Sequence, residues 1–508
     1  MKKNILYTFL LALALSVSSC LDKYPENAIL ADDAITTIDE ADQAVIGIYS
    51  SFLSGALYSG YLTLLPDIQT DLVYAVNGYT NTYGDIWRWN DILATNSQIE
   101  SVYAALYTVI GRCNFLLDNA ENMRKKMTDD DALDRLDVYC GEAYFARALA
   151  YSELIKQFCK AYESDADAQN ELGVVLRTHY YSDEPIKRAS LYDSYQQVLS
   201  DLELAEKALA LGDDYDIAVD GYMYNSTYFN EYTVCALRAR IALYMKKYDE
   251  AIKYSTKVID SGHYFLSSAT QLYDSQYSYY QYMWTSDNST EVIWKIGFTS
   301  TSYGGALGQV FFNYDYNSMK PDYVPAQWVL SLYDSNDLRY STFFQTFTTG
   351  HTHGLTWPLL AKYWGNEGLY NEAQLLHVSM PKVFRLSEQY LIRAEAYVMN
   401  EDFAKAGKDI TTLRKARYST YGTSTAISKD NAMKIVEEER VKELFMEGFR
   451  LMDLKRWHKG FERTPQEQSL ENGSSLVVEK DDPLFVWPIP QHEIESPGAE
   501  IEPNESNK

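Results

Sequence analysis

Residues 435–457 read IVEEERVKELFMEGFRLMDLKRW, the most ordered charge pattern in the chain. Arg440, Glu443, Glu447 and Arg450 follow one another at spacings of three, four and three residues. Side chains at these spacings are neighbours on a helix, so the pattern predicts one continuous helix that carries a ladder of opposite charges. Gly448 inside a helix costs up to ~1 kcal/mol relative to alanine, which indicates close backbone packing there.

The same stretch could hold either an acid–base site or a structural ion network. Apolar residues alternate with its charges, namely Leu444, Phe445, Phe449, Leu451 and Trp457. Because these residues would draw the charged groups toward a core, we interpret the ladder as a partly buried structural ion network.

Three further segments combine helical periodicity with small and aromatic residues at repeat-like spacing. They are residues 137–158, 232–262 and 386–417, and residues 191–209 form another amphipathic pattern. Small residues let paired helices approach closely and share a core, as in tetratricopeptide repeats. The sequence therefore predicts a mostly α fold with about four tetratricopeptide-like helix pairs, counting helices near 98–120 and 429–457.

The stretches between these units have a different texture. Residues 58–97 and 263–380 are rich in Tyr, Gly, Asn, Ser and Thr, and residues 289–298 alternate like a short strand. Long loops on a rigid scaffold are where binding residues concentrate. We expect a helical platform that carries a large, irregular, loop-rich insertion with short strands.

Composition narrows the class of ligand. The formal net charge of −26 argues against nucleic-acid binding, which needs a basic surface. The 44 Tyr and 9 Trp residues offer flat apolar faces with a polar edge, which suit the C–H patches and hydroxyls of sugar rings.

The N-terminus has the pattern of an export signal. Lys2 and Lys3 precede a short apolar run, and Cys20 follows directly, so residues 1–19 read as a signal peptide. Residues 17–20 resemble the lipobox of bacterial lipoproteins, which predicts cleavage before Cys20 and its acylation. Polar residues 20–40 would then form a tether to the membrane. An ordinary signal peptide with an incidental cysteine is the alternative.

Motifs for catalysis, metals and cofactors are absent from the sequence. There is no P-loop, G-x-G-x-x-G, H-E-x-x-H or G-x-S-x-G pattern, so we expect a binding protein with no cofactor rather than an enzyme. His351 and His353 are interpreted as an exposed loop rather than a metal site. The remaining cysteines are expected to be buried free thiols, although one bridge stays open: Cys113, Cys140, Cys159 and Cys235.

The charge ladder resembles the C-terminal signature of the SusD/RagB family, outer-membrane glycan-binding lipoproteins. The matching residues are Glu439, Arg440, Glu443, Leu444, Glu447, Gly448, Arg450, Asp453, Leu454 and Arg456. Residues 99–118, the helix around Arg147 and the segment PLFVWPIPQHEI at 483–494 are also similar to family segments. The chain departs from the family pattern at Cys159, where glycine is usual, and in its C-terminal tail.

The resemblance implies a lipid-anchored protein at the cell surface that caps a SusC-like, TonB-dependent transporter in the outer membrane. It would capture oligosaccharide and pass it on without cleaving it. The implied organisation is an N-terminal helical region at 41–262 including the 58–97 loop, an insertion at 263–380 and a C-terminal helical region at 381–508.

The resemblance also implies where a sugar would bind. Asp71 and Tyr74 occupy positions where the family often has an acidic residue and a stacking aromatic ring. Trp87 and Trp89 flank Arg88, and in an extended segment both rings would face one side, although Trp89 could equally be a core anchor. From the insertion, the candidates are Tyr282, Trp284 and Tyr316.

Two other functions remain open at this point. Some family branches serve oligopeptide transporters, and dense Tyr with Asn and Ser could bind an extended peptide. A surface glycosidase is the third hypothesis, because the spacing of paired carboxylates is set by the fold.

Overall fold

The structure is a computed structural model that describes most residues of the chain. These are residues 34–76, 81–210, 219–220, 223–224, 226–315, 318–346, 356–421, 425–464 and 476–507. Cys20, Tyr316, His351 and His353 lie outside the described residues.

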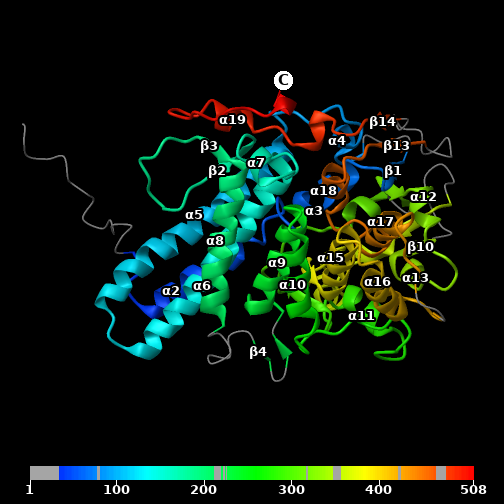
Figure 1. The fold of residues 1–508 in the computed structure, drawn as a ribbon. Coiled ribbons are helices and arrows are strands. Elements are labelled where there is room, and N and C mark those ends of the chain that lie inside the picture. Colours follow the sequence, from blue (N-terminus) through cyan, green and yellow to red (C-terminus); the bar gives the residue numbers. More distant parts are fainter. Residues whose placement is uncertain are drawn as a thin grey trace, which may run out of the picture.

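Long helices in sequence order form one side of the molecule (Figure 1). They are α2 (Ile38–Ser51), α5 (Ser97–Lys126), α6 (Asp130–Phe158) and α8 (Leu191–Leu209). Helix α6 packs against both α5 and α8, and α2 lies against α5 and α6. The amphipathic pattern at 191–209 predicts the bounds of α8 correctly.

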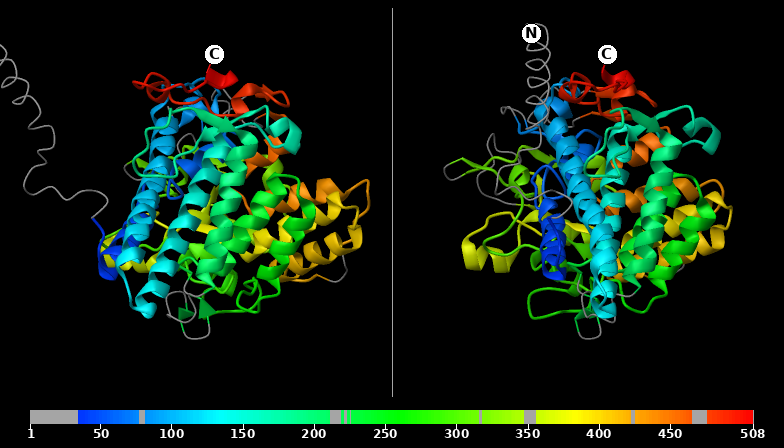
Figure 2. Two further views of the ribbon diagram at one scale, coloured as in Figure 1. Left: turned by 60° about the vertical axis from the view of Figure 1, so that its left-hand side comes forward. Right: turned by 90° about the vertical axis from the view of Figure 1, so that its left-hand side faces the viewer.

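Two helical hairpins continue this row, as Figure 2 shows. They are α9 (Glu231–Tyr244) with α10 (Tyr248–Ile259), and α15 (Leu386–Met399) with α16 (Phe403–Arg417). Helix α10 packs on α15, which joins the two hairpins into one stack. The prediction of a mostly α, tetratricopeptide-like scaffold is confirmed.

Small residues let the paired helices approach closely, as the sequence predicts. Ala143, Ala146 and Ala150 of α6 are fully buried. A Cβ atom added to Gly141 would lie 2.8 Å from Cβ of Ala208 in α8, so no larger residue fits there without movement. The alternation of small and large side chains therefore sets the distance between α6 and α8.

The predicted continuous helix over 435–457 is wrong. Helix α17 (Ala432–Glu443) ends and α18 (Arg450–Arg456) begins after six intervening residues, among which Gly448 has a φ of +82°. The Asp67 carboxylate accepts hydrogen bonds from the backbone N–H groups of Gly448 and Arg450, both at 2.9 Å. These two hydrogen bonds take the place of the backbone hydrogen bonds that a continuous helix would make there. The prediction of close backbone packing is confirmed, because a Cβ atom on Gly448 would lie 3.1 Å from the carbonyl oxygen of Leu62.

The charge ladder is buried, as the sequence predicts. Glu443 is inaccessible and accepts hydrogen bonds from Arg417 at 2.9 Å, Arg385 at 3.0 Å and Arg339 at 3.2 Å. Burial alone would raise the pKa of Glu443, but the guanidinium groups of Arg417 and Arg385 hold that pKa below its ordinary value. These ion pairs join α16 and α17 to the insertion.

Short elements make up the rest of the structure. The N-terminal half contributes α3 (Tyr61–Ile68), β1 (Val73–Ala75), α4 (Gly84–Trp87), α7 (Asp165–Ala168), β2 (Leu172–Val175), β3 (Arg188–Ser190), β4 (Val219–Asp220) and β5 (Met223–Tyr224). The insertion contributes α11 (Tyr279–Thr285), β6 (Val292–Lys295), η3 (Gln309–Phe311), β7 (Tyr314–Asp315), β8 (Ser318–Met319), β9 (Tyr323–Pro325), α12 (Gln327–Leu330), α13 (Arg339–Phe343), β10 (Phe344–Thr346), β11 (Pro358–Leu360), η5 (Ala361–Tyr363) and α14 (Glu367–Ala373). The C-terminal part adds β12 (Lys382–Arg385), β13 (Phe461–Arg463), β14 (Leu476–Val478), η7 (Pro483–Phe485), α19 (Gln491–Ile494) and η8 (Glu505–Asn507).

Every sheet among the described residues is a two-stranded antiparallel ladder. Strand β6 confirms the short strand predicted at 289–298, but its burial does not alternate, because Val292, Ile293 and Trp294 are all buried. The ladder that positions the site is β1 with β9, in which Tyr74 lies opposite Val324.

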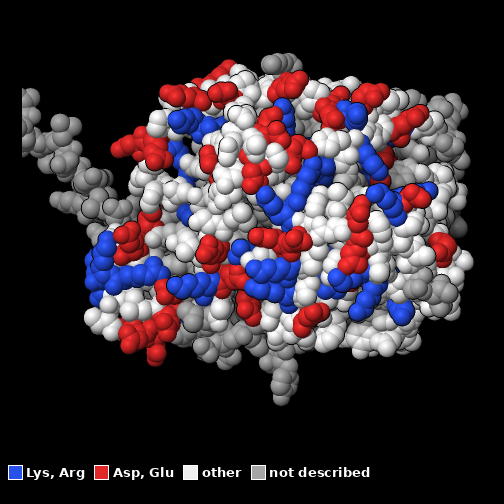
Figure 3. All heavy atoms as spheres, in the orientation of Figure 1, with Lys and Arg blue, Asp and Glu red and all other residues white. Residues whose placement is uncertain are grey.

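The C-terminal segment closes one end of the molecule, at the top of Figure 1. Trp487 is inaccessible, and its indole N–H donates to Oε1 of Gln69 at 2.9 Å. Acidic and basic side chains are interspersed over the face in Figure 3, and acidic ones gather along its upper edge. The four described cysteines are buried free thiols, as expected: Cys113, Cys140, Cys159 and Cys235.

Candidate functional site

The segment from α3 to α5 has a strained backbone. Asn81, Tyr83 and Trp89 all have a positive φ, at 53°, 64° and 62°. Non-glycine residues in this conformation cost of order 1 kcal/mol or more each, and they cluster at functional sites. The segment is therefore a candidate binding element on geometric grounds as well as by sequence.

Hydrogen bonds to the insertion fix this segment in place. The Asn81 amide donates to the carbonyl oxygens of Val76 at 3.1 Å and Asp322 at 2.9 Å. Thr82 Oγ1 donates to the Asp322 carboxylate at 2.9 Å, and the Tyr323 hydroxyl donates to the Thr82 carbonyl at 2.6 Å. Asp322, which precedes strand β9, and Tyr323, which lies within it, therefore hold the strained loop.

Trp87 and Trp89 do not present a shared aromatic face. Trp87 is inaccessible, and its indole N–H donates to the Val73 carbonyl at 3.0 Å. Trp89 donates to the Gln69 carbonyl at 2.7 Å and packs edge-on against Phe461 and Phe485. The prediction of an extended backbone for this pair is wrong, because α4 ends at Trp87 and the backbone of Trp89 has a left-handed φ of 62°. Trp89 has the core-anchor position that was the alternative.

Asp71 and Tyr74 do meet, at an open hollow of about 600 Å³. We call it the Trp328 hollow, and its walls are Asp71, Tyr74, Gln327, Trp328, Glu462 and Thr464. The β1–β9 ladder brings Tyr74 next to the start of α12, and the segment after β13 closes the third side. The hollow thus combines two aromatic rings with carboxylate, amide and hydroxyl groups.

Three interactions orient the walls of the Trp328 hollow. The indole N–H of Trp328 donates to the Asp71 carbonyl at 2.8 Å, so the ring is held by its polar edge. The Asp71 carboxylate accepts two hydrogen bonds from Arg450, at 3.0 and 2.8 Å. The Arg450 guanidinium also lies 5.4 Å from the centre of the Trp328 ring. Burial lowers the pKa of Arg450, but Asp71 more than offsets this and the net direction is upward. The Trp328 indole and the Asp71 carboxylate are therefore held in place before a ligand binds.

The insertion candidates do not join this hollow. Trp284 is only 4% exposed, and the ammonium groups of Lys362 and Lys382 lie 4.3 and 4.7 Å from its ring centre. Tyr282 in α11 stacks on Tyr273 with ring centres 3.6 Å apart. Neither residue lines the Trp328 hollow, and Tyr316 lies outside the described residues.

Sequence reasoning missed Gln327, Trp328, Glu462 and Thr464. Trp328 is separated from Asp71 by more than 250 residues, and only the β1–β9 pairing brings the two together. The sequence signal that could have indicated this site is the pair Gln327–Trp328, which directly follows a short apolar segment in the loop-rich insertion.

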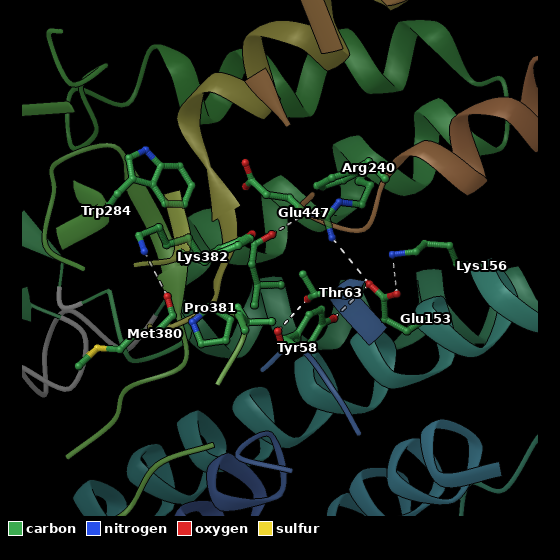
Figure 4. A pocket seen from close by; sticks show the side chains of 14 residues that line it. Tyr58, Thr63, Glu153, Lys156, Arg240, Trp284, Met380, Pro381, Lys382 and Glu447 are labelled. Carbon is green, nitrogen blue, oxygen red and sulfur yellow. Dashed lines mark hydrogen bonds and ion pairs between the residues drawn. The ribbon is translucent and has the colours of Figure 1, made fainter. Parts of the chain in front are cut away.

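A charged cavity in the interior is too small for a sugar (Figure 4). Glu153 pairs there with Lys156 at 2.8 Å and accepts a hydrogen bond from the Tyr58 hydroxyl at 3.1 Å. Arg240 lies 4.0 Å from the same carboxylate. The cavity holds about 30 Å³, roughly the volume of one water molecule in the liquid. These groups form a buried ion cluster around Glu153.

The described ranges contain no group of three or more His, Cys, Asp or Glu side chains that could hold a metal ion. No helix within the same ranges is long and apolar enough to cross a bilayer.

Comparison with known proteins agrees with the resemblance noted in the sequence. A family model described as "SusD family" matches residues 355–499, and one described as "Starch-binding associating with outer membrane" matches residues 21–243. The chain belongs to the SusD/RagB family. The matched ranges contain the charge ladder, α5 and α6, and the whole 58–97 loop.

Relatives and solved structures extend the comparison to nearly the whole chain. SusD-like proteins P38 and P25 of Formosa agariphila are 24% and 22% identical, over 91% and 89% of this chain and 92% and 89% of their own lengths. A SusD superfamily protein from Bacteroides thetaiotaomicron has a TM-score of 0.77 at 24% identity, covering 92% of this chain and 99% of that one. A putative sugar binding protein from Bacteroides vulgatus has a TM-score of 0.75 at 23% identity, covering 94% and 100%. These structures share the fold of this SusD/RagB protein.

Proposed function

We propose that this SusD/RagB protein binds a glycan at the Trp328 hollow and does not cleave it. The observation that carries the proposal is the preorganised pairing of Trp328 with Asp71 beside Tyr74. Trp328 is partly exposed, so the part of its ring that Arg450 does not cover can meet the C–H patch of a sugar, and the surrounding acceptors and donors suit hydroxyl groups. The family description and the sugar-binding relatives support the same ligand class.

The hollow favours a glycan over a peptide. Peptide capture by strand addition needs an exposed strand edge. Of the strands beside the hollow, β1 and β9 are paired with each other and all their residues are buried, and β13, which carries Glu462, is paired with β14.

Affinity electrophoresis in gels that contain single polysaccharides tests this site. Trp328→Ala should lower retention by the bound glycan, with an affinity loss of at least about fivefold, because an aromatic contact contributes about 1 kcal/mol beyond the area it buries. Trp364→Ala is the matched control, because Trp364 is 43% exposed and lies outside the hollow. Equal retention of Trp328→Ala and wild type would rule out this placement.

We further propose that acylated Cys20 anchors the protein in the outer membrane, where it delivers glycan to a SusC-like, TonB-dependent transporter. Support comes from the lipobox-like residues 17–20 and from the family description, which names association with the outer membrane. Labelling of cells with a palmitate analogue should mark the wild type and not Cys20→Ala. Detergent extracts should yield a complex with a TonB-dependent barrel, and a wild-type protein purified alone under these conditions would refute the partnership.

The non-catalytic assignment has its own test. The purified protein, incubated with the glycan that retains it, should release no reducing sugar. Steady release that tracks protein concentration would favour the glycosidase hypothesis.

A further inference from the structure

A second open hollow, of about 650 Å³, lies beside the C-terminal segment. Its walls come from the chain between α6 and α8, from α18 and the turn that follows it, and from η7 and η8. We call it the C-terminal hollow. It shares no lining residue with the Trp328 hollow, so it is a separate site.

Acidic groups dominate the walls of the C-terminal hollow. Two lysines and one histidine line it, against the carboxylates of Glu163, Asp167, Glu171, Asp481, Asp482 and Glu505. Between these charges lie apolar side chains, among them Leu191, Phe485 and Val486. The hollow therefore combines an excess of negative charge with apolar surface.

Only half of these carboxylates have a basic partner. Lys160 pairs with Glu171 at 3.1 Å. His458 lies between two others, with its ring nitrogens 2.9 Å from Glu163 and 2.7 Å from Asp481. The remaining three make no ion pair within the described ranges, and they are Asp167, Asp482 and Glu505.

The second lysine of the hollow, Lys455, does not compensate these carboxylates. Its Nζ donates to the carbonyl oxygens of Lys156 at 2.6 Å and Cys159 at 2.8 Å, where α6 ends. Burial lowers the pKa of Lys455 to about 7, so a substantial share of this group carries no charge at neutral pH. The negative charge of the hollow therefore remains unbalanced.

An orphan hydroxyl marks the same hollow. Ser506 in η8 is 8% exposed and lines the hollow, and its Oγ has no hydrogen-bond partner among the residues that the structure describes. Buried polar groups in proteins are nearly always hydrogen-bonded. The hydroxyl therefore lacks a group that a ligand can supply, and as an acceptor it suits an ammonium donor.

The arrangement fits an extended organic cation better than a metal ion. No cluster of His, Cys, Asp or Glu in the described part of the chain is grouped closely enough to hold a metal. Carboxylates spread around apolar side chains instead match several ammonium groups that are joined by methylene chains. The volume also lies in the range of small-molecule sites, about 300–1,000 Å³.

We infer that the C-terminal hollow binds an aliphatic polyamine. Its ammonium groups pair with Asp167, Asp482 and Glu505, and its methylene chain lies on the apolar wall. This site is independent of the proposed glycan site and gives the protein a second, cationic class of ligand.

Calorimetric titration of the purified protein at physiological ionic strength tests the inference. The probes are spermidine and putrescine, with butylamine as a single ammonium group and Mg²⁺ as a compact divalent charge. Asp482→Asn combined with Glu505→Gln removes two unpaired carboxylates, and the asparagine can still accept the 2.9 Å hydrogen bond from the Leu484 N–H. The matched control, Asp130→Asn combined with Asp131→Asn, removes two exposed carboxylates at the other end of α6.

The wild type should bind one spermidine per chain, more tightly than putrescine, and both more tightly than butylamine or Mg²⁺. The Asp482/Glu505 double variant should bind spermidine at least about fivefold more weakly because two charge contacts are lost. Ser506→Ala should weaken binding about threefold through the lost hydrogen bond, and the control should bind like the wild type. The inference is overturned if Mg²⁺ binds as tightly as spermidine, if the control loses as much affinity as the double variant, if either variant of the hollow binds like the wild type, or if no polyamine binds.

Discussion

Removing one carboxylate from the buried ion network should destabilise the whole molecule. In Glu443→Gln the side chain keeps its size but loses the charge that faces Arg339, Arg385 and Arg417 at 2.9–3.2 Å. Breaking a buried, hydrogen-bonded ion pair costs about 3–5 kcal/mol. Because three guanidinium groups share this carboxylate and the amide NH₂ of glutamine would face one of them, we expect at least about 3 kcal/mol.

This loss of free energy converts to a measurable shift in the melting temperature. The entropy of unfolding is about 2.1 cal/mol/K per residue, or roughly 1 kcal/mol/K for a chain of this length. Glu443→Gln should therefore melt about 3–5 °C below the wild type, as followed by circular dichroism or calorimetry. Glu438→Gln, on the same helix but partly exposed and paired among the described residues only with Lys434, should change the melting temperature by less than about 1 °C.

Two results would refute the reasoning. A Glu443→Gln protein that melts within 1 °C of the wild type would mean that the network does not hold α16 and α17 to the insertion. Equal destabilisation by Glu438→Gln would mean that the helix, rather than the buried pairing, responds to charge loss.

Three further predictions concern other buried groups. Burial raises the pKa of Glu142 from 4.5 to about 8, so the folded protein keeps a proton that the unfolded chain has lost, and stability should fall as pH rises between these values. Glu142→Gln should flatten that decline in the melting temperature between pH 5 and 8, and the glutamine can still accept the 2.6 Å hydrogen bond from Tyr49. Curves of melting temperature against pH that run parallel for the variant and the wild type would contradict this prediction. Gly448→Ala should cost about 1–3 kcal/mol in chemical denaturation because of its left-handed φ, and an unchanged midpoint would show that the turn adapts. The four buried cysteines should react with a thiol reagent only after denaturant is added, and immediate reaction of the native protein would contradict their burial.

The helical part of the fold was readable from sequence because its determinants are local. Apolar periodicity gives the bounds of α8, and Lys246–Lys247 lie at the turn between α9 and α10. The break between α17 and α18 was not readable in the same way. It depends on the Asp67 carboxylate, which is nearly 400 residues away in the chain and caps the first turn of α18.

The candidate site was only half readable, for the same reason. Asp71 and Tyr74 were identified through the family resemblance, and the structure places both at one hollow. Trp87 and Trp89 were misplaced because a left-handed backbone at Trp89 cannot be inferred from its neighbours. Trp328 was missed because strand pairing across the insertion brings it to Asp71.

A crystal structure of the protein soaked with the glycan that retains it most strongly tests the central claim most directly. The account predicts a sugar ring against the face of Trp328, with its hydroxyls within hydrogen-bond distance of side chains that line that hollow. A glycan bound only at surfaces away from the Trp328 hollow would contradict it.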